Sequence, residues 1–260
     1  MAEVLQGAEP FAFEGNDIGV LVLHGFTGST QSVRDLGEGL HQKFGFSVAA
    51  PRLPGHGTSP DDMERTGYLD WLGEAENALR RLCARKKRVF VTGLSMGGTL
   101  TLNLGARFPD LVTAIAPIAA PAAFRSEAMA QVLLMNPAPQ RIPGIGSDIK
   151  APGVKELAYA ETPVGCLREV SVLVSATGDL LHKIVCPTLV IHAREDHVVP
   201  PANAMAIVQA VRCDDIRLLW LNHSYHVATL DNDKALIIER VGAFFTEIAR
   251  AAPASRAVVA

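Results

Sequence analysis

The fold is decided by the stretch Arg88-Val89-Phe90-Val91-Thr92-Gly93-Leu94-Ser95-Met96-Gly97-Gly98-Thr99-Leu100. Its first five residues are mainly β-branched and aromatic, which is typical of a buried strand, and residues 99–107 are compatible with a helix. Between them, Gly93-x-Ser95-x-Gly97 predicts a tight turn with the serine at its apex, because glycine leaves room for close backbone packing. The serine hydroxyl would then lie at a helix N-terminus, where amide N–H groups and the helix dipole favour a developing negative charge.

The glycine–serine motif needs support from the rest of the chain, since a glycine-rich turn with an incidental serine has the same pattern. The chain has 260 residues, of which 48% are hydrophobic and 20% are charged, so it is long and apolar enough for one α/β domain with an insertion. Its net charge of −3 argues against a nucleic-acid-binding surface. The N-terminus lacks the pattern of a secretory signal, and the four cysteines lack metal-ligand spacing, so we expect a cytoplasmic protein without a metal site.

Predicted strands alternate with predicted helices along most of the chain. Besides the run before Gly93, strands are expected at 18–23, 46–50, 112–116, 187–192 and 216–221, with an edge strand near 11–13. Helices are expected at 33–44, 68–84, 99–107, 167–181, 202–211 and 234–251. This alternation predicts a doubly wound, mainly parallel sheet, whose ligands bind beyond the carboxyl ends of the strands.

The segment from 121 to 165 breaks this pattern, because it is rich in proline and carries little strand signal. It contains an Ala- and Met-rich piece, residues 128–135, and the turn Pro143-Gly144-Ile145-Gly146. We interpret it as a cap inserted into a core formed by residues 1–120 and 166–251. The last residues, 252–260, are expected to be a disordered tail.

A serine hydroxyl becomes a nucleophile only with a base to accept its proton and a third group to orient that base. In hydrolases of this architecture the order along the chain is serine, acid, histidine. Glu195 and Asp196 follow the predicted strand 187–192, and His223 and His226 follow the predicted strand 216–221. The pattern supplies both residue types in the required order but does not choose within either pair.

The remaining histidines are interpreted as structural. His24 directly follows a predicted strand and is expected to brace the neighbouring loop rather than react. The sequence indicates no reaction partner for the others, which are His41, His56, His182, His192 and His197.

Four stretches resemble the α/β-hydrolase superfamily and, more narrowly, the bacterial monoacylglycerol lipases. They are Val20-Leu-Val-Leu-His-Gly-Phe-Thr-Gly28, Gly93-Leu-Ser-Met-Gly-Gly98, Glu195-Asp-His-Val-Val-Pro-Pro201 and Ser224-Tyr-His-Val-Ala-Thr-Leu-Asp231. The pieces Ile145-Gly-Ser-Asp-Ile-Lys150 and Val154-Lys-Glu-Leu-Ala-Tyr159 resemble the cap of those enzymes. The resemblance extends over about residues 7 to 248.

The resemblance assigns roles to particular residues. It implies a catalytic triad of Ser95, Asp196 and His226. It implies an oxyanion hole formed by the amides of Phe26 and Met96. It further implies that Ile145 lines an acyl tunnel and that Glu156 binds the glycerol group. From the residues alone, Ile145 would be interpreted as apolar packing and Glu156 as a solvated glutamate.

We therefore expect a cofactor-free serine hydrolase that cleaves monoacylglycerols. A general short- to medium-chain carboxylesterase is the alternative, since the same triad serves both, and a non-hydrolytic ligand receptor on this fold is a third possibility. The expected partner is a small lipid ester and not a nucleic acid. The Ala- and Met-rich cap piece suggests, at most, transient contact with a membrane or micelle. The sequence does not determine the oligomeric state.

Overall fold

The computed structural model describes residues 2–123 and 127–251. Within these ranges the main sheet has seven strands in the order β1-β3-β2-β4-β5-β8-β9. Their bounds are β1 (Phe11–Phe13), β2 (Ile18–Leu23), β3 (Ser47–Ala50), β4 (Arg88–Leu94), β5 (Ala114–Ile118), β8 (Thr188–Ala193) and β9 (Ile216–Leu221). All neighbouring strands are parallel except β1, which pairs antiparallel with β3. The predicted doubly wound, mainly parallel sheet is confirmed.

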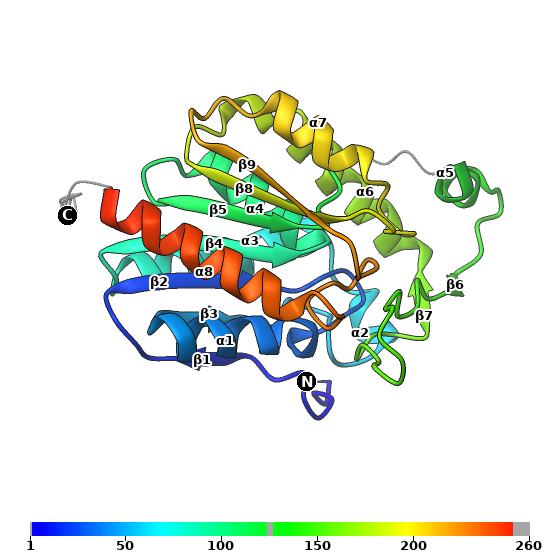
Figure 1. The fold of residues 1–260 in the computed structure, drawn as a ribbon. Coiled ribbons are helices and arrows are strands. Elements are labelled where there is room, and N and C mark those ends of the chain that lie inside the picture. Colours follow the sequence, from blue (N-terminus) through cyan, green and yellow to red (C-terminus); the bar gives the residue numbers. More distant parts are fainter. Residues whose placement is uncertain (1, 124–126, 252–260) are drawn as a thin grey trace.

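Helices cover both faces of this sheet (Figure 1). One face packs against α1 (Arg34–Phe44) and α8 (Lys234–Ala251), and this apolar layer includes the Phe90 and Phe245 rings, whose centroids are 4.7 Å apart. The other face packs against α3 (Tyr68–Cys83), α4 (Met96–Arg107), α6 (Val164–Gly178) and α7 (Ala202–Ala210). Burial on both faces explains why β2 is an uninterrupted apolar run and why β4 is mainly apolar.

The strand register brings the carboxyl ends of the central strands to one edge. Leu23 pairs with Gly93, Leu94 pairs with Ile118, and Ala193 pairs with Leu221. The loops that carry His24, Ser95, Asp196 and His226 all begin at these ends. The sheet therefore gathers at one edge residues far apart in the sequence, such as Ser95 and His226, which are 131 positions apart.

Three predicted elements begin two or more residues away from the expected position. Helix α4 begins at Met96 rather than residue 99, so Gly97 and Gly98 lie within its first turn. Helix-weakening glycines are accommodated there because packing against β2 outweighs their low helix propensity. Strand β5 lies two residues later than expected, and α6 begins three residues earlier, with a short 3-10 helix at Leu181–Lys183.

The inserted segment, residues 121–165, contains more regular structure than its sequence indicates. Helix α5 (Glu127–Leu134) is followed by β6 (Arg141–Pro143) and β7 (Glu161–Pro163), which form a small antiparallel sheet. These two short strands gave little signal in the sequence because each has three residues and ends in proline, whose missing N–H is tolerated at strand ends. The predicted tail, residues 252–260, lies outside the described residues.

The inserted segment lies at the edge of the sheet that carries the site loops (Figure 1). The Tyr159 N–H donates to the Thr27 carbonyl, and the Val227 N–H donates to the Asp148 carbonyl.

The remaining short elements outside the sheet are the 3-10 helix Thr30–Val33 and α2 (Pro60–Met63). In the part of the chain that is described, no helix has the length and apolar character to cross a membrane.

Candidate active site

The turn between β4 and α4 holds Ser95 in a strained backbone conformation, with φ 56° and ψ −119°. Its flanking glycines are required by close backbone packing. A Cβ at Gly93 would lie 2.4 Å from the Gly97 carbonyl oxygen, and a Cβ at Gly97 would lie 2.1 Å from the Leu23 carbonyl oxygen. Only glycine fits at either position, and the strain at a non-glycine residue with positive φ is typical of functional sites.

The Ser95 hydroxyl is hydrogen-bonded to His226, and His226 is hydrogen-bonded to Asp196. The distance from Ser95 Oγ to His226 Nε2 is 2.9 Å, and the distance from His226 Nδ1 to Asp196 Oδ2 is also 2.9 Å. Asp196 has no proton to donate when ionised, so Nδ1 carries the imidazole proton and Nε2 is free to accept from the serine. We call Ser95, His226 and Asp196 the triad.

Asp196 is buried, and backbone and side-chain donors hold both of its carboxylate oxygens. Oδ1 accepts from the Val198 N–H at 2.9 Å and the Val199 N–H at 2.7 Å. Oδ2 lies 3.2 Å from His192 Nε2 as well as 2.9 Å from His226. Burial alone would raise the pKa of Asp196, but the charge of His226 and these hydrogen bonds outweigh it and bring the pKa below its usual range. The acid is therefore ionised and oriented.

His226 is a stronger base than an ordinary histidine. Burial lowers its pKa, but the Asp196 charge and hydrogen bond, with smaller effects from Glu156 and Asp148, raise the pKa overall. A carboxylate that favours the imidazolium helps the ring to accept the serine proton. The arrangement can therefore generate a serine nucleophile.

The loop after β2 lies directly against Ser95. A Cβ at Gly25 would be 3.3 Å from the Ser95 Cβ, so the backbone of Gly25 and Phe26 passes close to the hydroxyl. His24 is buried, contacts the Gly25 carbonyl through Nδ1, and accepts the Leu53 N–H at Nε2. Burial lowers the pKa of His24 to about 4, so the ring is neutral and braces this loop, in line with its predicted role.

Residues 16–233 match the family model Hydrolase_4, which is described as serine aminopeptidase, S33. The match covers every strand of the main sheet except β1, the turn that holds Ser95, and all three triad residues. The chain belongs to the Hydrolase_4 family.

Relatives of this Hydrolase_4 protein include named lipases and esterases. It is 46% identical over 244 residues to a thermostable monoacylglycerol lipase of Bacillus sp. strain H-257, covering 94% of this chain and 96% of the relative. It is 32% identical over 243 residues to a carboxylesterase of Bacillus subtilis strain 168, covering 92% and 97%.

Solved structures confirm the α/β-hydrolase fold. A structure from work on LipS and LipT, two metagenome-derived lipolytic enzymes, superposes with a TM-score of 0.91 at 49% identity and covers 94% of this chain and 100% of its own. A monoacylglycerol lipase of Paleococcus ferrophilus has a TM-score of 0.74 at 15% identity, covers 92% of this chain and 99% of its own, and shows the shared fold.

In this Hydrolase_4 member, Ile145 and Glu156, which the sequence singled out in the inserted segment, lie in different surroundings. The Glu156 carboxyl packs on the loop after β2, since a Cβ at Gly28 would lie 2.6 Å from Oε1. Burial raises the pKa of Glu156 to about 7, opposed by smaller effects from His226 and the Ser32 hydroxyl. Glu156 is thus not a solvated glutamate. The Ile145 side chain is 41% exposed, so the structure does not seat it in the core.

The structure distinguishes Asp196 from Glu195 and His226 from His223, the two pairs within which the residue pattern did not choose. Glu195 reaches outward and pairs with Lys150 Nζ at 3.0 Å. His223 donates its backbone N–H to Asp233, and its ring has no contact with the triad among the described hydrogen bonds. Asp196 and His226 are therefore the acid and histidine that contact each other.

Sequence reasoning missed three residues around the triad. His192 is buried and contacts Asp196, and Asp148 contacts both His197 and the His226 backbone. The sequence indicates no partner for His192 or His197. The contact of His192 with Asp196 depends on how the loop after β8 folds back on the strand, and His197 contacts a residue 49 positions away. The position of His192 at the carboxyl end of a predicted strand, four residues before Asp196, was the available signal.

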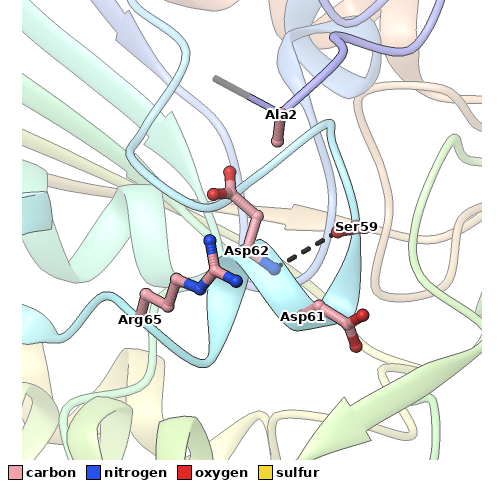
Figure 2. Close-up of a pocket in the computed structure, with 5 residues that line it drawn as sticks. All are labelled: Ala2, Ser59, Asp61, Asp62 and Arg65. Carbon is pink, nitrogen blue, oxygen red and sulfur yellow. Dashed lines mark hydrogen bonds between the residues drawn. The ribbon is translucent and has the colours of Figure 1, made fainter.

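A separate hollow on the surface is lined by Ala2, Ser59, Asp61, Asp62 and Arg65 (Figure 2). None of the triad residues contributes to it. In Figure 2 the Ser59 side chain accepts from the Asp62 N–H, which caps the short helix α2.

Within residues 2–123 and 127–251, no group of three His, Cys, Asp or Glu side chains is arranged to hold a metal ion.

Proposed function

We propose that this protein is a serine ester hydrolase whose substrates are monoacylglycerols, which it cleaves to a fatty acid and glycerol without a cofactor. One observation carries the proposal, namely the continuous hydrogen bonding from Ser95 through His226 to the buried Asp196. Ser95 lies in the glycine-flanked turn between β4 and α4. The names of its relatives, a monoacylglycerol lipase and a carboxylesterase, support an ester substrate.

In the first half of the reaction, Ser95 Oγ attacks the ester carbonyl while His226 Nε2 takes its proton. Asp196 holds the opposite ring nitrogen and stabilises the imidazolium that forms. His226 then donates the proton to the departing alcohol, leaving an acyl group on Ser95. Water attacks this acyl-enzyme by the reverse path, with His226 again as base, and the fatty acid leaves.

The amides of Phe26 and Met96 form the proposed oxyanion hole. Met96 is the first residue of α4, so its N–H belongs to the first turn and lacks an acceptor within the helix. The Ser95 N–H is already donated to the Ile118 carbonyl at 2.9 Å, which leaves the next amide as the donor on this side. The Phe26 amide approaches from the loop after β2. Removing one such donor typically costs about 10²–10³-fold in rate.

Glu156 is the proposed recognition residue for the glycerol group. Its carboxyl is enclosed by Gly28 and Ser32 and lies near enough to His226 to affect its pKa. A carboxyl group is a strong partner for a free hydroxyl of glycerol, which a simple alkyl ester lacks. This contrast favours monoacylglycerols over plain carboxylic esters.

The inserted segment, residues 121–165, is the proposed cap over the acyl chain, with Ile145 lining its tunnel. Leu134 and Met135 are 83% and 50% exposed, which gives this segment an apolar outer surface for transient contact with a micelle or membrane. The carboxylesterase alternative uses the same triad. A ligand receptor would need no aligned serine, histidine and aspartate, so we do not favour it.

The chemistry is tested with Ser95→Ala, which removes the nucleophile and little volume. We expect a folded variant with ester hydrolysis reduced by about 10⁴-fold or more. A fluorophosphonate probe should label the wild type at Ser95, and His223→Ala, as a matched control, should retain both labelling and turnover. Labelling at another residue, or near-normal turnover of Ser95→Ala, would remove Ser95 from the mechanism.

The substrate class is tested with Glu156→Ala and a pair of esters of the same fatty acid. A hydrogen bond to a charged group contributes about 1.5–3 kcal/mol, so kcat/KM for the monoacylglycerol should fall about 10–100-fold. The methyl ester should change little, because it never made that bond. Glu161→Ala, at the exposed first residue of β7, is the control. Equal losses on both esters would favour the carboxylesterase alternative.

A further inference from the structure

Asp148 lies in the inserted segment, yet it contacts the loop that carries Asp196 and the loop that carries His226. Its Oδ2 accepts the backbone N–H of His197 at 3.2 Å and the backbone N–H of His226 at 3.1 Å. Its Oδ1 contacts His197 Nδ1 at 2.9 Å, and its own carbonyl accepts the Val227 N–H at 3.1 Å. One carboxylate therefore joins the residue after Asp196 to the backbone of His226.

The neighbours of Asp148 extend this connection in both directions. Lys150, two residues later, donates its backbone N–H to Asp231 at 2.7 Å and its ammonium group to Glu195 at 3.0 Å. Ser147, one residue earlier, accepts the backbone N–H of Glu156 at 3.0 Å. The residues on either side of Asp148 are thus tied to the triad loops and to Glu156.

We propose that Asp148 is a positioning residue that fixes the loops of Asp196 and His226 relative to each other and couples the inserted segment to the triad. This inference rests on the proposed hydrolase function. The Asp148 side chain is only 15% exposed, so its hydrogen bonds are protected from water. The two loops come from different strands, β8 and β9, and the carboxylate bridges them from a third segment. A carboxylate suits this role because it accepts several N–H bonds at once.

The charge of Asp148 also acts on His226. Four groups face the His226 imidazole, namely Asp196, Glu156, Asp148 and the Ser95 hydroxyl, and the three carboxylates all raise its pKa. Asp148 in turn faces His197, whose pKa it raises through their hydrogen bond. Removing the charge of Asp148 should therefore lower the pKa of His226 as well as loosen the loops.

The experiment compares Asp148→Asn and Asp148→Ala with Arg141→Gln. Arg141 ties the same inserted segment to Asp61 and Glu64 of the core but contacts neither triad loop. We measure kcat and KM for an acetate ester across pH and for a long-chain ester of the same alcohol, the rate of Ser95 labelling by a fluorophosphonate, and the melting temperature of each variant. The acetate ester is used because its short acyl group does not need the cap.

We expect Asp148→Ala to lower kcat/KM and the labelling rate in parallel by about tenfold or more, the loss expected for a hydrogen bond to a charged group. Asp148→Asn should lose less, because its amide oxygen still accepts. In both, the acidic limb of the pH profile should move to lower pH. Arg141→Gln should leave acetate turnover unchanged. If Asp148→Ala does not fold, Asp148→Asn is compared with the wild type and with Arg141→Gln instead.

Two outcomes would overturn the inference. In the first, Asp148 variants melt earlier but retain wild-type turnover and labelling below their melting temperature. In the second, the loss is confined to long acyl chains, which would place Asp148 in the substrate pocket alone. A wild type that neither hydrolyses esters nor labels at Ser95 would instead contradict the proposed function, so the two failures are distinguishable.

Discussion

At the scale of single residues, the site depends on carboxylates in unlike surroundings. Asp196 is buried, but four donors hold it ionised, and its pKa lies below the usual range. Glu156 is enclosed with few donors, and burial raises its pKa to about 7. Both act on the same imidazole. The protonation state of His226 is therefore the property through which pH should control activity.

The pH profile of kcat/KM should report the raised pKa of His226. The reaction needs this histidine neutral, so the rate should fall as pH drops through its pKa, and the acidic limb should lie above the 6.5 of an ordinary histidine. Glu156→Gln removes one charge that favours the imidazolium and should move the limb to lower pH. Because Glu156 is itself partly protonated near pH 7, we expect a shift of less than about one pH unit.

The control for this pH measurement is Glu195→Gln. Glu195 is next to Asp196 in sequence, but its carboxylate pairs with Lys150 and is not among the groups that raise the pKa of His226. Its removal should leave the acidic limb in place. An acidic limb unmoved by Glu156→Gln would show that Glu156 does not face the base in solution.

At the scale of elements, the turn between β4 and α4 is packed so closely, backbone against backbone, that a side chain at Gly93 or Gly97 would not fit. Gly93 and Gly97 lie against each other and against the end of β2. The strained conformation of Ser95 persists because the sheet and the helix are both fixed by the cores they bury. The position of Ser95 is thus a property of the strand–turn–helix unit.

Gly97→Ala should destabilise this unit strongly. The new Cβ would lie 2.1 Å from the Leu23 carbonyl oxygen, a backbone atom that moves only with β2. We expect a loss of about 3 kcal/mol or more in the free energy of unfolding, measured by denaturant titration, together with loss of activity. Gly73→Ala in α3 is the matched control, because a Cβ there meets no atom within 4 Å. It should be neutral or stabilising by up to about 1 kcal/mol. Similar stability of the two variants would contradict the packing argument.

At the scale of the whole molecule, the inserted segment, residues 121–165, is attached to the core at separate points. Arg141 in β6 pairs with Asp61 and Glu64, and the Tyr159 hydroxyl donates to the Gly55 carbonyl at 2.8 Å. Asp148 and Lys150 contact the triad loops. The substrate pocket is therefore expected to form between this segment and the edge of the sheet, rather than within the core alone.

Ile145→Ser tests whether this segment contacts the acyl chain of the substrate. If Ile145 lines the proposed tunnel, the change should alter kcat/KM for long-chain esters severalfold and leave acetate esters nearly unchanged, since burial of apolar surface contributes only where the chain reaches it. A series of esters with graded acyl length provides the measurement. An equal change at every length would indicate a general loss of packing. Val154→Ser, at a similarly exposed position, is the control.

The local architecture was determined by the sequence alone. Apolar runs predicted the buried strands, Gly93-x-Ser95-x-Gly97 predicted the turn, and the order of serine, acid and histidine predicted which loops meet. These signals are local, because burial on both faces and close backbone packing restrict which residue types can occupy each position. The shifted boundaries of α4, β5 and α6 mark where tertiary packing outweighed local preference.

Only the tertiary structure decided which side chains touch. It selected Asp196 over Glu195 and His226 over His223, since adjacent loop residues of one chemical type point in different directions. It also revealed the contact of His192 with Asp196, which depends on the fold of the loop after β8, and the contacts of Asp148, whose partner His226 lies on a loop that no spacing in the sequence connects to it. A hydrogen bond requires two atoms within about 3 Å and aligned, and for residues far apart in the chain the packing of helices on the sheet sets that distance.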